Sequence, residues 1–218
     1  MEPPTNSKPM NLNFTEASSL AAIDRQIDSK NSDISPAQYE IIRQVIYSTA
    51  DFEYSDLLKF SEDALSKGAA SLTASTPIVV DVPEIQVGIV PLLQQTFLNP
   101  VYCCATSKDQ TQLAGSKATQ GLETLAQKHP KSIFIIGQDE LAFNKLKELI
   151  AKKTINPSLA IATPPMFVEP NQRKFAVSST IPNIYADAQK GGATIATAIF
   201  KTLVNLTWQA HRISYSQD

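Results

Sequence analysis

The sequence predicts an α/β protein of three layers, with a mostly parallel five-stranded sheet, helices on both faces and a helical N-terminal part. Five short apolar runs without polar alternation follow residue 76, as is typical of strands buried on both faces. Segments with helical periodicity separate these runs, and such alternation favours a parallel sheet. The runs cover residues 77–82, 101–106, 132–137, 159–163 and 182–186.

Three helices have clear boundary signals. Ser35 precedes a proline and is followed three residues later by Gln38, a pattern that predicts a capping box. Asp139 and the next residue, Glu140, place acids at the start of a helix that ends in lysines, which complements the helix dipole. Gly191 and Gly192 precede a long final helix, which we expect to run to about residue 211.

The length of 218 residues suits one sizeable domain. We expect residues 1–13 to form a mobile arm, residues 14–213 the domain and residues 214–218 a tail. The formal charge of −2 is spread along the chain and favours neither nucleic acid nor a bilayer surface. The polar start predicts no secretory signal, and no apolar run approaches the roughly 20 residues of a membrane span. The adjacent Cys103 and Cys104 indicate reduced thiols in a cytoplasmic protein.

Common catalytic and cofactor motifs are absent from the sequence. Neither a dinucleotide-binding nor a P-loop glycine pattern occurs, and no G-x-S-x-G elbow is present. The two histidines, His129 and His211, together with two cysteines do not supply a zinc site. We therefore predict no metal.

The segment 41–52, which reads IIRQVIYSTADF, resembles the end of the first catalytic helix of precorrin-8X methylmutases. Further blocks resemble the same family in order and spacing, so the resemblance extends from about residue 15 to residue 203. These blocks lie at residues 19–24, 60–61, 77–81 with 87–89, 103, 136–137, 164 with 167–168, and 190–193.

The resemblance implies a sheet of the predicted type and a homodimer that holds a tetrapyrrole near the subunit interface. It implies an isomerase of cobalamin biosynthesis that moves a methyl group from C11 to C12 of precorrin-8X or its cobalt form. The product is hydrogenobyrinate or cobyrinate, and no cofactor takes part.

Tyr47 stands where the family carries the histidine that acts as general acid. A phenol can donate a proton, although its reference pKa is about 10, compared with about 6.5 for histidine. The resemblance therefore implies Tyr47 as the catalytic residue. The alternative is that Tyr47 is an amphipathic helix-end residue without a chemical role.

The resemblance also implies residues that bind the carboxylate-rich substrate. Several of these positions depart from the family pattern, which has arginines where Gln44 and Gln120 stand. Helix capping and tight turns are the alternative roles for the hydroxyl residues and glycines. The predicted substrate-binding residues are Ser19, Gln44, Thr49, Asp81, Thr119, Gln120, Gln138, Lys174, Gly191 and Gly192.

Three functions are compatible with these observations. The first is a precorrin-8X methylmutase that uses Tyr47 as proton donor. The second is a catalytically impaired relative that binds a corrinoid or tetrapyrrole, because arginine is the side chain best suited to paired carboxylate contacts and is scarce here. The third is a non-catalytic dimeric scaffold.

Overall fold

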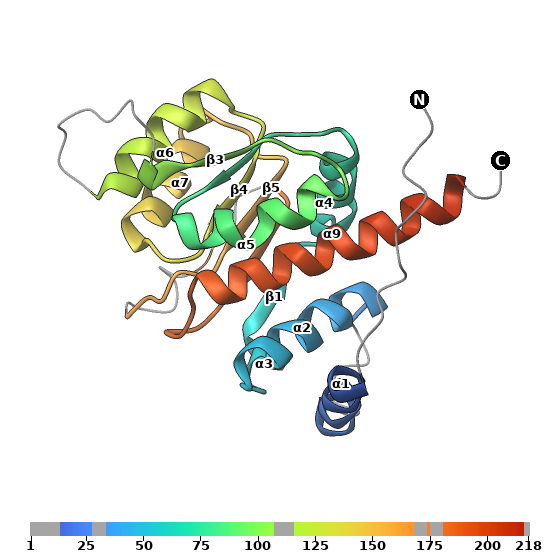
Figure 1. The fold of residues 1–218 in the computed structure, drawn as a ribbon. Helices are drawn as coiled ribbons and strands as arrows, with labels where there is room; N and C mark the ends of the chain where they lie inside the picture. Colours follow the sequence, from blue (N-terminus) through green and yellow to red (C-terminus); the bar gives the residue numbers. More distant parts are fainter. Residues whose placement is uncertain (1–13, 28–33, 107–115, 168–173, 175–180, 216–218) are drawn as a thin grey trace.

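A computed structural model of the chain describes residues 14–27, 34–106, 116–167, 174 and 181–215. The predicted arm (1–13) and the last three residues of the predicted tail lie outside these ranges. Figure 1 shows a central sheet between two layers of helices, with α1 and α2 at one side and a long C-terminal helix that crosses one face. The three-layer arrangement is the one that the sequence predicts.

Six strands form the sheet, in the order β1-β6-β5-β4-β2-β3. The five predicted strands are all present and pair in parallel. The sixth, β1, was not predicted and pairs antiparallel with β6 at the edge. The strands are β1 (Leu58–Phe60), β2 (Ile78–Val80), β3 (Val101–Cys103), β4 (Ile133–Ile136), β5 (Leu159–Ala162) and β6 (Asn183–Ala186).

Alternate residues of the strands face two separate cores, because successive side chains of a strand point to opposite faces. On β4, Ile133 and Ile135 belong to the core that also contains buried residues of α2, α4, α5 and α9. Phe134 and Ile136 pack under α6 and α7 on the other face. All four side chains are completely buried, as the unbroken apolar runs predict.

The helices begin close to their sequence signals. Ser35 accepts a hydrogen bond from the backbone N–H of Gln38, whose side chain accepts one from Ser35 N–H, so the predicted capping box is present. The last helix starts after Gly192 and continues through Tyr215, four residues beyond the expected end. The helical segments are α1 (Phe14–Ile27), α2 (Pro36–Thr49), α3 (Tyr54–Leu57), α4 (Ala64–Thr73), α5 (Pro83–Gln94), η1 (Cys104–Thr106), α6 (Lys117–Lys128), α7 (Glu140–Ala151) and α9 (Ala193–Tyr215).

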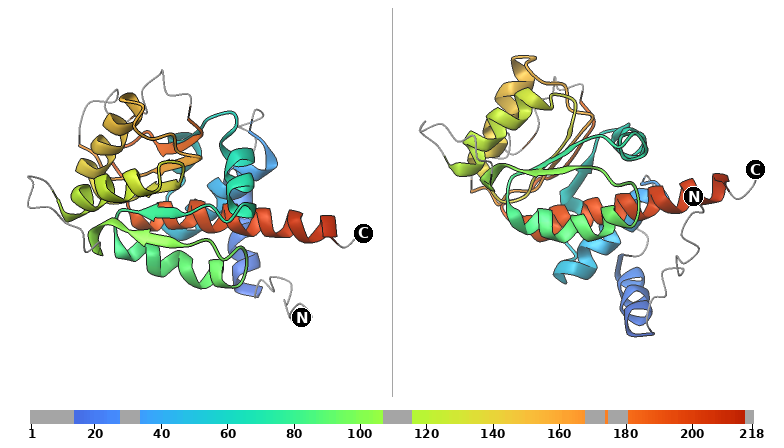
Figure 2. Two further views of the ribbon diagram at one scale, coloured as in Figure 1. Left: turned by 90° about the horizontal axis from the view of Figure 1, so that it is seen from above. Right: turned by 45° about the horizontal axis from the view of Figure 1, so that its top comes forward.

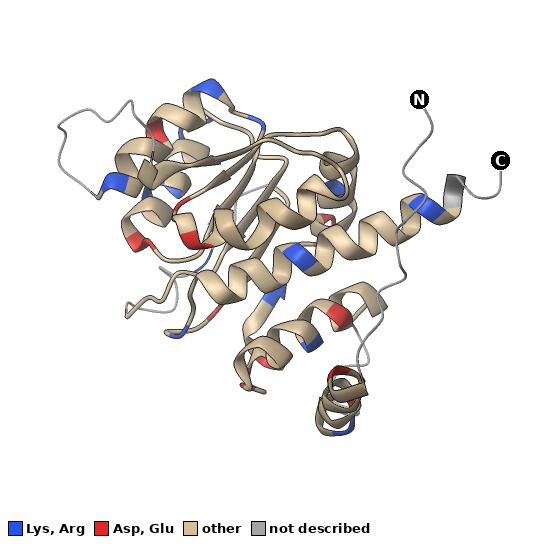
Figure 3. Cartoon of the chain, in the orientation of Figure 1, with Lys and Arg blue, Asp and Glu red and all other residues tan. Residues whose placement is uncertain are grey.

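Both views in Figure 2 show that the C-terminal end of α9 extends beyond the body of the molecule. Within the described part of the chain, no helix combines the length and apolar character needed to cross a membrane. Cys103 and Cys104 are both free and buried, as expected for reduced thiols. Charged residues of both signs are spread along the helices, as the colours of Figure 3 show.

Candidate active site

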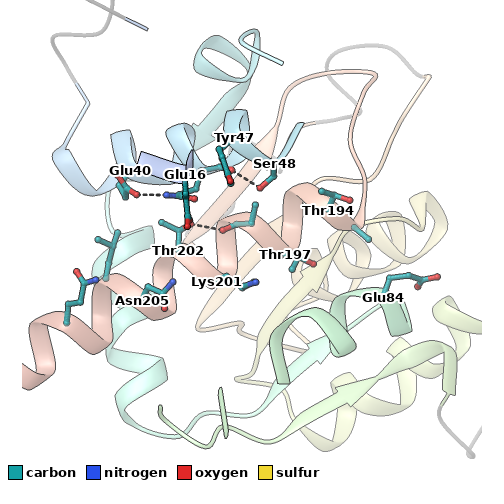
Figure 4. A pocket seen from close by; sticks show the side chains of 15 residues that line it. Glu16, Glu40, Tyr47, Ser48, Glu84, Thr194, Thr197, Lys201, Thr202 and Asn205 are labelled. Carbon is teal, nitrogen blue, oxygen red and sulfur yellow. Dashed lines mark hydrogen bonds between the residues drawn. The ribbon is translucent and has the colours of Figure 1, made fainter. Parts of the chain in front are cut away.

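A cavity of about 850 Å³ lies along the outer faces of α2 and α9. Its volume is within the range of small-molecule sites. Helices α1 and α5 each add one glutamate to its wall, and Figure 4 shows the side chains that enter it. The lining residues are Glu16, Glu40, Gln44, Tyr47, Ser48, Glu84, Ala193, Thr194, Thr197, Ala198, Lys201, Thr202, Asn205, Leu206 and Gln209.

Tyr47 reaches this cavity because of the periodicity of α2. The side chains of Ile42, Val45 and Ile46 are buried in the core, which turns the opposite face of the helix outward. Tyr47 lies in the last turn and is 42% exposed. The helix stops just beyond it, where Ala50 adopts a left-handed backbone conformation and donates its N–H to the carbonyl of Ile46. The phenol is therefore held on a rigid element and is open to a ligand.

Gln44 lies one turn before Tyr47 and also lines the cavity. Its amide Nε2 donates to Glu40 at 2.8 Å. Glu40 also accepts from Arg43 at 2.6 Å, and Arg43 is paired in turn with Asp24 at 2.9 Å. Arg43 thus pairs with one acid on each of the two helices and links α1 to α2 beside the cavity.

The wall formed by α9 carries a polar stripe that was not predicted. We call Thr197, Lys201, Asn205 and Gln209 the α9 stripe; these residues are four apart and all line the cavity. Residues four apart lie on one face of a helix. The four-residue repeat is visible in the sequence, but the packing of Ile199 and Phe200 into the core is what turns the stripe outward.

Asp81 does not line the cavity. It is completely buried at the end of β2, and its carboxylate accepts the backbone N–H groups of Gly137, Gln138 and Asp139 at 3.1, 2.7 and 2.9 Å. Burial raises the pKa of Asp81, and the three N–H donors oppose that shift. Its contacts fix the loop between β4 and α7, in which Gln138 is an exposed residue.

The acidic pair at the start of α7 acts as a helix cap. The Asp139 carboxylate accepts the backbone N–H of Ala142 at 2.8 Å. Glu140 follows in the first turn, where a negative charge is favourable. This is the capping role that the sequence suggested.

Gly191 and Gly192 form the turn before α9 rather than part of the cavity wall. A Cβ on Gly191 would lie 2.2 Å from the carbonyl oxygen of Thr163, so only glycine permits this close approach. Gly192 has a φ of 135° and donates its N–H to the same carbonyl at 2.7 Å. The two glycines therefore determine where α9 starts relative to β5.

The hydroxyls of Ser19 and Thr49 make local helix contacts. Ser19 donates to the Thr15 carbonyl at 2.9 Å, and Thr49 donates to the Val45 carbonyl at 2.8 Å. Thr49 also accepts the N–H of Asp51 at 3.3 Å. Neither side chain lines the cavity; Ser19 bonds within α1, and only Thr49 lies at a helix end.

The remaining predicted residues lie elsewhere. Thr119 and Gln120 are on α6, which packs on the opposite face of the sheet, and the Thr119 hydroxyl is 2.9 Å from that of the N-cap Ser116. Lys174 is 3.4 Å from the Asp187 carboxylate. Of the predicted site residues, the cavity thus brings together Gln44 and Tyr47 alone.

Comparisons with known proteins identify the family of the chain. A family model described as precorrin-8X methylmutase matches residues 15–206. The chain is 32% identical to a cobalt-precorrin-8 methylmutase of Synechocystis sp. over 88% of this chain and 94% of that protein. It is 30% identical to a cobalt-precorrin-8 methylmutase of Leptospira interrogans, over 78% of this chain and 83% of that protein.

Solved structures show the same relationship. The precorrin-8X methylmutase of Thermus thermophilus superposes with a TM-score of 0.81 at 25% identity, over 91% of this chain and 99% of that one. A precorrin-8X methylmutase related protein gives a TM-score of 0.72 at 26% identity, over 86% and 99% of the two chains. The fold is that of an α/β protein, and a cavity lies along two of its helices. The chain belongs to the precorrin-8X methylmutase family.

Proposed function

We propose that this protein is an isomerase of cobalamin biosynthesis that acts on precorrin-8X or cobalt-precorrin-8, with Tyr47 as the proton donor. The observation that supports this role most directly is the position of Tyr47, which reaches a cavity of about 850 Å³ from the last turn of α2. Family membership supplies the reaction, in which a methyl group moves from C11 to C12 of the ring.

For this reaction the protein has to transfer a proton and to position the substrate. The reaction is an isomerisation, so a proton given to the ring must return before the next turnover. Tyr47 can donate its phenolic proton to a ring atom, and the resulting phenolate can take a proton back after the methyl group has moved. The hydroxyl of Ser48 and the amide of Gln44 line the same wall and can orient the ligand.

Assembly and location form part of the same proposal. The protein is a cytoplasmic homodimer, as the resemblance implies, and a second subunit would lie near the open cavity. Sedimentation equilibrium tests the dimer directly, because a dimer has twice the 23.8 kDa mass of one chain. A single-chain mass at micromolar concentration would contradict it.

One observation favours a second function, in which the protein binds a corrinoid without converting it. Three glutamates line the cavity, against one lysine. Glu84 has no ion-pair partner in the described part of the chain, so it would repel a carboxylate-rich substrate. Phenol is also a weaker acid than imidazolium.

Substitution of Tyr47 distinguishes the two functions. Turnover of cobalt-precorrin-8 can be followed by the visible spectrum, because methyl migration changes the chromophore. If Tyr47 is the acid, we expect Tyr47→Phe to reduce kcat by about 10²-fold or more, with little change in ligand binding. Tyr102→Phe is the matched control, because Tyr102 is a similarly exposed tyrosine on the edge strand β3, away from the cavity.

The Tyr47→His variant completes the test. Activity that appears only in Tyr47→His would mean that the natural protein has kept its pocket and lost its acid, which favours the binding function. Equal turnover by the natural protein and Tyr47→Phe would exclude Tyr47 as the proton donor.

A further inference from the structure

Lys201 lines the cavity but has no role in the proposed proton transfer. It lies on the outer face of α9, it is exposed, and it lines the cavity together with Tyr47. Among the described residues it has no ion-pair partner, whereas Arg43, Lys145, Lys152, Lys174 and Lys190 are all paired with acids. It is also the one cationic residue of the described cavity wall.

The neighbours of Lys201 on the α9 stripe are also available to a ligand. Within the described part of the chain, the side chains of Thr197, Asn205 and Gln209 have no hydrogen-bond partner. At about 1.5 Å of rise per residue, the stripe from Thr197 to Gln209 extends for about 18 Å. It therefore presents a hydroxyl, an ammonium and two amides in a row long enough to contact several side chains of a large ligand.

The acids of the cavity restrict where an anionic group can bind. Glu84 stands on α5 and Glu16 on α1, and Glu40 on α2 is already paired with Arg43 and Gln44. A carboxylate near Glu84 would be repelled, whereas one beside Lys201 would form a charge-assisted hydrogen bond. The charge distribution thus selects the α9 wall for the acidic groups of a ligand.

We propose that Lys201 binds a peripheral carboxylate of the tetrapyrrole and that the α9 stripe sets the orientation of the ring relative to Tyr47. This inference rests on the proposed function for the identity of the ligand. It assigns a specificity-determining role to a residue that neither the sequence patterns nor the family resemblance indicated.

The experiment measures dissociation constants for hydrogenobyrinic acid and for its neutral methyl ester by absorbance titration. We expect Lys201→Met to weaken binding of the acid by about ten- to a hundredfold, the range for one hydrogen bond to a charged group. The ester lacks the carboxylates, so the natural protein and Lys201→Met should bind it with affinities within about twofold of each other. Lys201→Arg should keep most of the affinity for the acid, and Lys201→Glu should bind it more weakly than Lys201→Met does.

Lys117→Met is the matched control, because Lys117 is also exposed and has no ion-pair partner in the described structure, but lies on α6 away from the cavity. The inference is overturned if Lys201→Met binds the acid as the natural protein does. It is also overturned if acid and ester lose affinity equally, since the loss would then come from packing. Failure of the natural protein to bind the acid at all would exclude it as well.

Failure of this inference can be told apart from failure of the proposed function. A protein that binds the acid through Lys201 but never turns over cobalt-precorrin-8 would retain the carboxylate contact without the catalysis. Normal turnover with an unchanged KM in Lys201→Met would leave the catalytic proposal in place and remove the role of Lys201.

Discussion

At the scale of single residues, Asp81 shows how a sequence position can indicate function and still have a structural role. An acid at the end of a buried parallel strand is a reasonable site candidate, because ligands bind beyond these ends. Here the carboxylate is enclosed and already accepts three backbone N–H groups. Its contacts replace water as the partner of the loop after β4, which would otherwise hold buried, unpaired donors.

Asp81→Asn tests this structural role. The amide can replace one carboxylate oxygen, but its NH₂ group would face a backbone donor and leave at least one N–H unsatisfied. We expect the free energy of unfolding, measured with urea, to fall by about 1–3 kcal/mol. The opposite result would be an unfolding free energy within about 0.5 kcal/mol of the natural value, which is a small change for a buried polar site, together with a raised KM. That result would instead assign Asp81 to substrate binding.

At the scale of elements, one ion-pair cluster joins the two helices that form the cavity. Lys190, in the loop before α9, pairs with Asp51 at 2.5 Å and Glu53 at 2.8 Å in the loop after α2. Its ammonium also lies 5.7 Å from the centre of the Tyr54 ring. The hydrogen bond from Lys190 lowers the pKa of Asp51, while both acids raise the pKa of Lys190. The cluster ties the end of α2 that bears Tyr47 to the start of α9.

Lys190→Met should therefore lower the urea midpoint of unfolding at pH 7. The folded-state pKa of Asp51 is lowered, so its contribution to stability is complete above the unfolded value near 3.8 and disappears as the pH falls through the folded value. The difference in midpoint between the natural protein and Lys190→Met should accordingly shrink below about pH 4.

Lys152→Met provides the control for this cluster. Lys152 is the C-cap of α7 and pairs at 2.5 Å with Glu148 of that helix, so its loss removes an ion pair that joins no two elements. Such exposed pairs contribute little, and its midpoint should remain close to that of the natural protein. A Lys190→Met effect that persists unchanged at pH 2 would show that packing, rather than the ion pair with Asp51, is responsible.

At the scale of the whole molecule, the sequence was most informative where burial is complete. Strands such as β4 are apolar on both faces, and helix caps such as Ser35 and Asp139 act within a few residues of the chain, so local patterns predict them. Strand β1 could not be predicted in this way, because its three residues Leu58–Phe60 have no distinctive pattern and pair with β6, which lies more than a hundred residues later.

The candidate site was predicted less completely, because its residues are brought together by contacts between segments that are far apart in the sequence. Tyr47 was found through its resemblance to a family motif, and its neighbour Gln44 shares its helix face. Lys201 and Glu84 reach the cavity from α9 and α5, and only the packing of these helices on the sheet decides which of their polar residues face it. A polar residue on a helix surface has the same sequence signature whether it faces a cavity or open solvent.

The two cores should unfold together, as the predicted single domain requires, because β4 contributes adjacent residues to both. Trp208 is the one tryptophan of the chain; it packs edge-on against Phe97 with ring centres 5.1 Å apart and lies against the core under α9. Phe134 is completely buried in the other core. We expect Phe134→Leu to cost about 1–2 kcal/mol through loss of buried ring atoms.

In a single cooperative unit, that cost shifts the urea transition of Trp208 fluorescence as much as the transition of the far-UV circular dichroism. Ile135→Val is the matched substitution on the neighbouring residue, since it loosens the core to which Trp208 belongs by about 0.5–1.5 kcal/mol. If Phe134→Leu moved the circular dichroism transition and left the Trp208 transition in place, the two faces of the sheet would unfold separately. The cavity wall of α9 could then remain folded while the layer of α6 and α7 is lost.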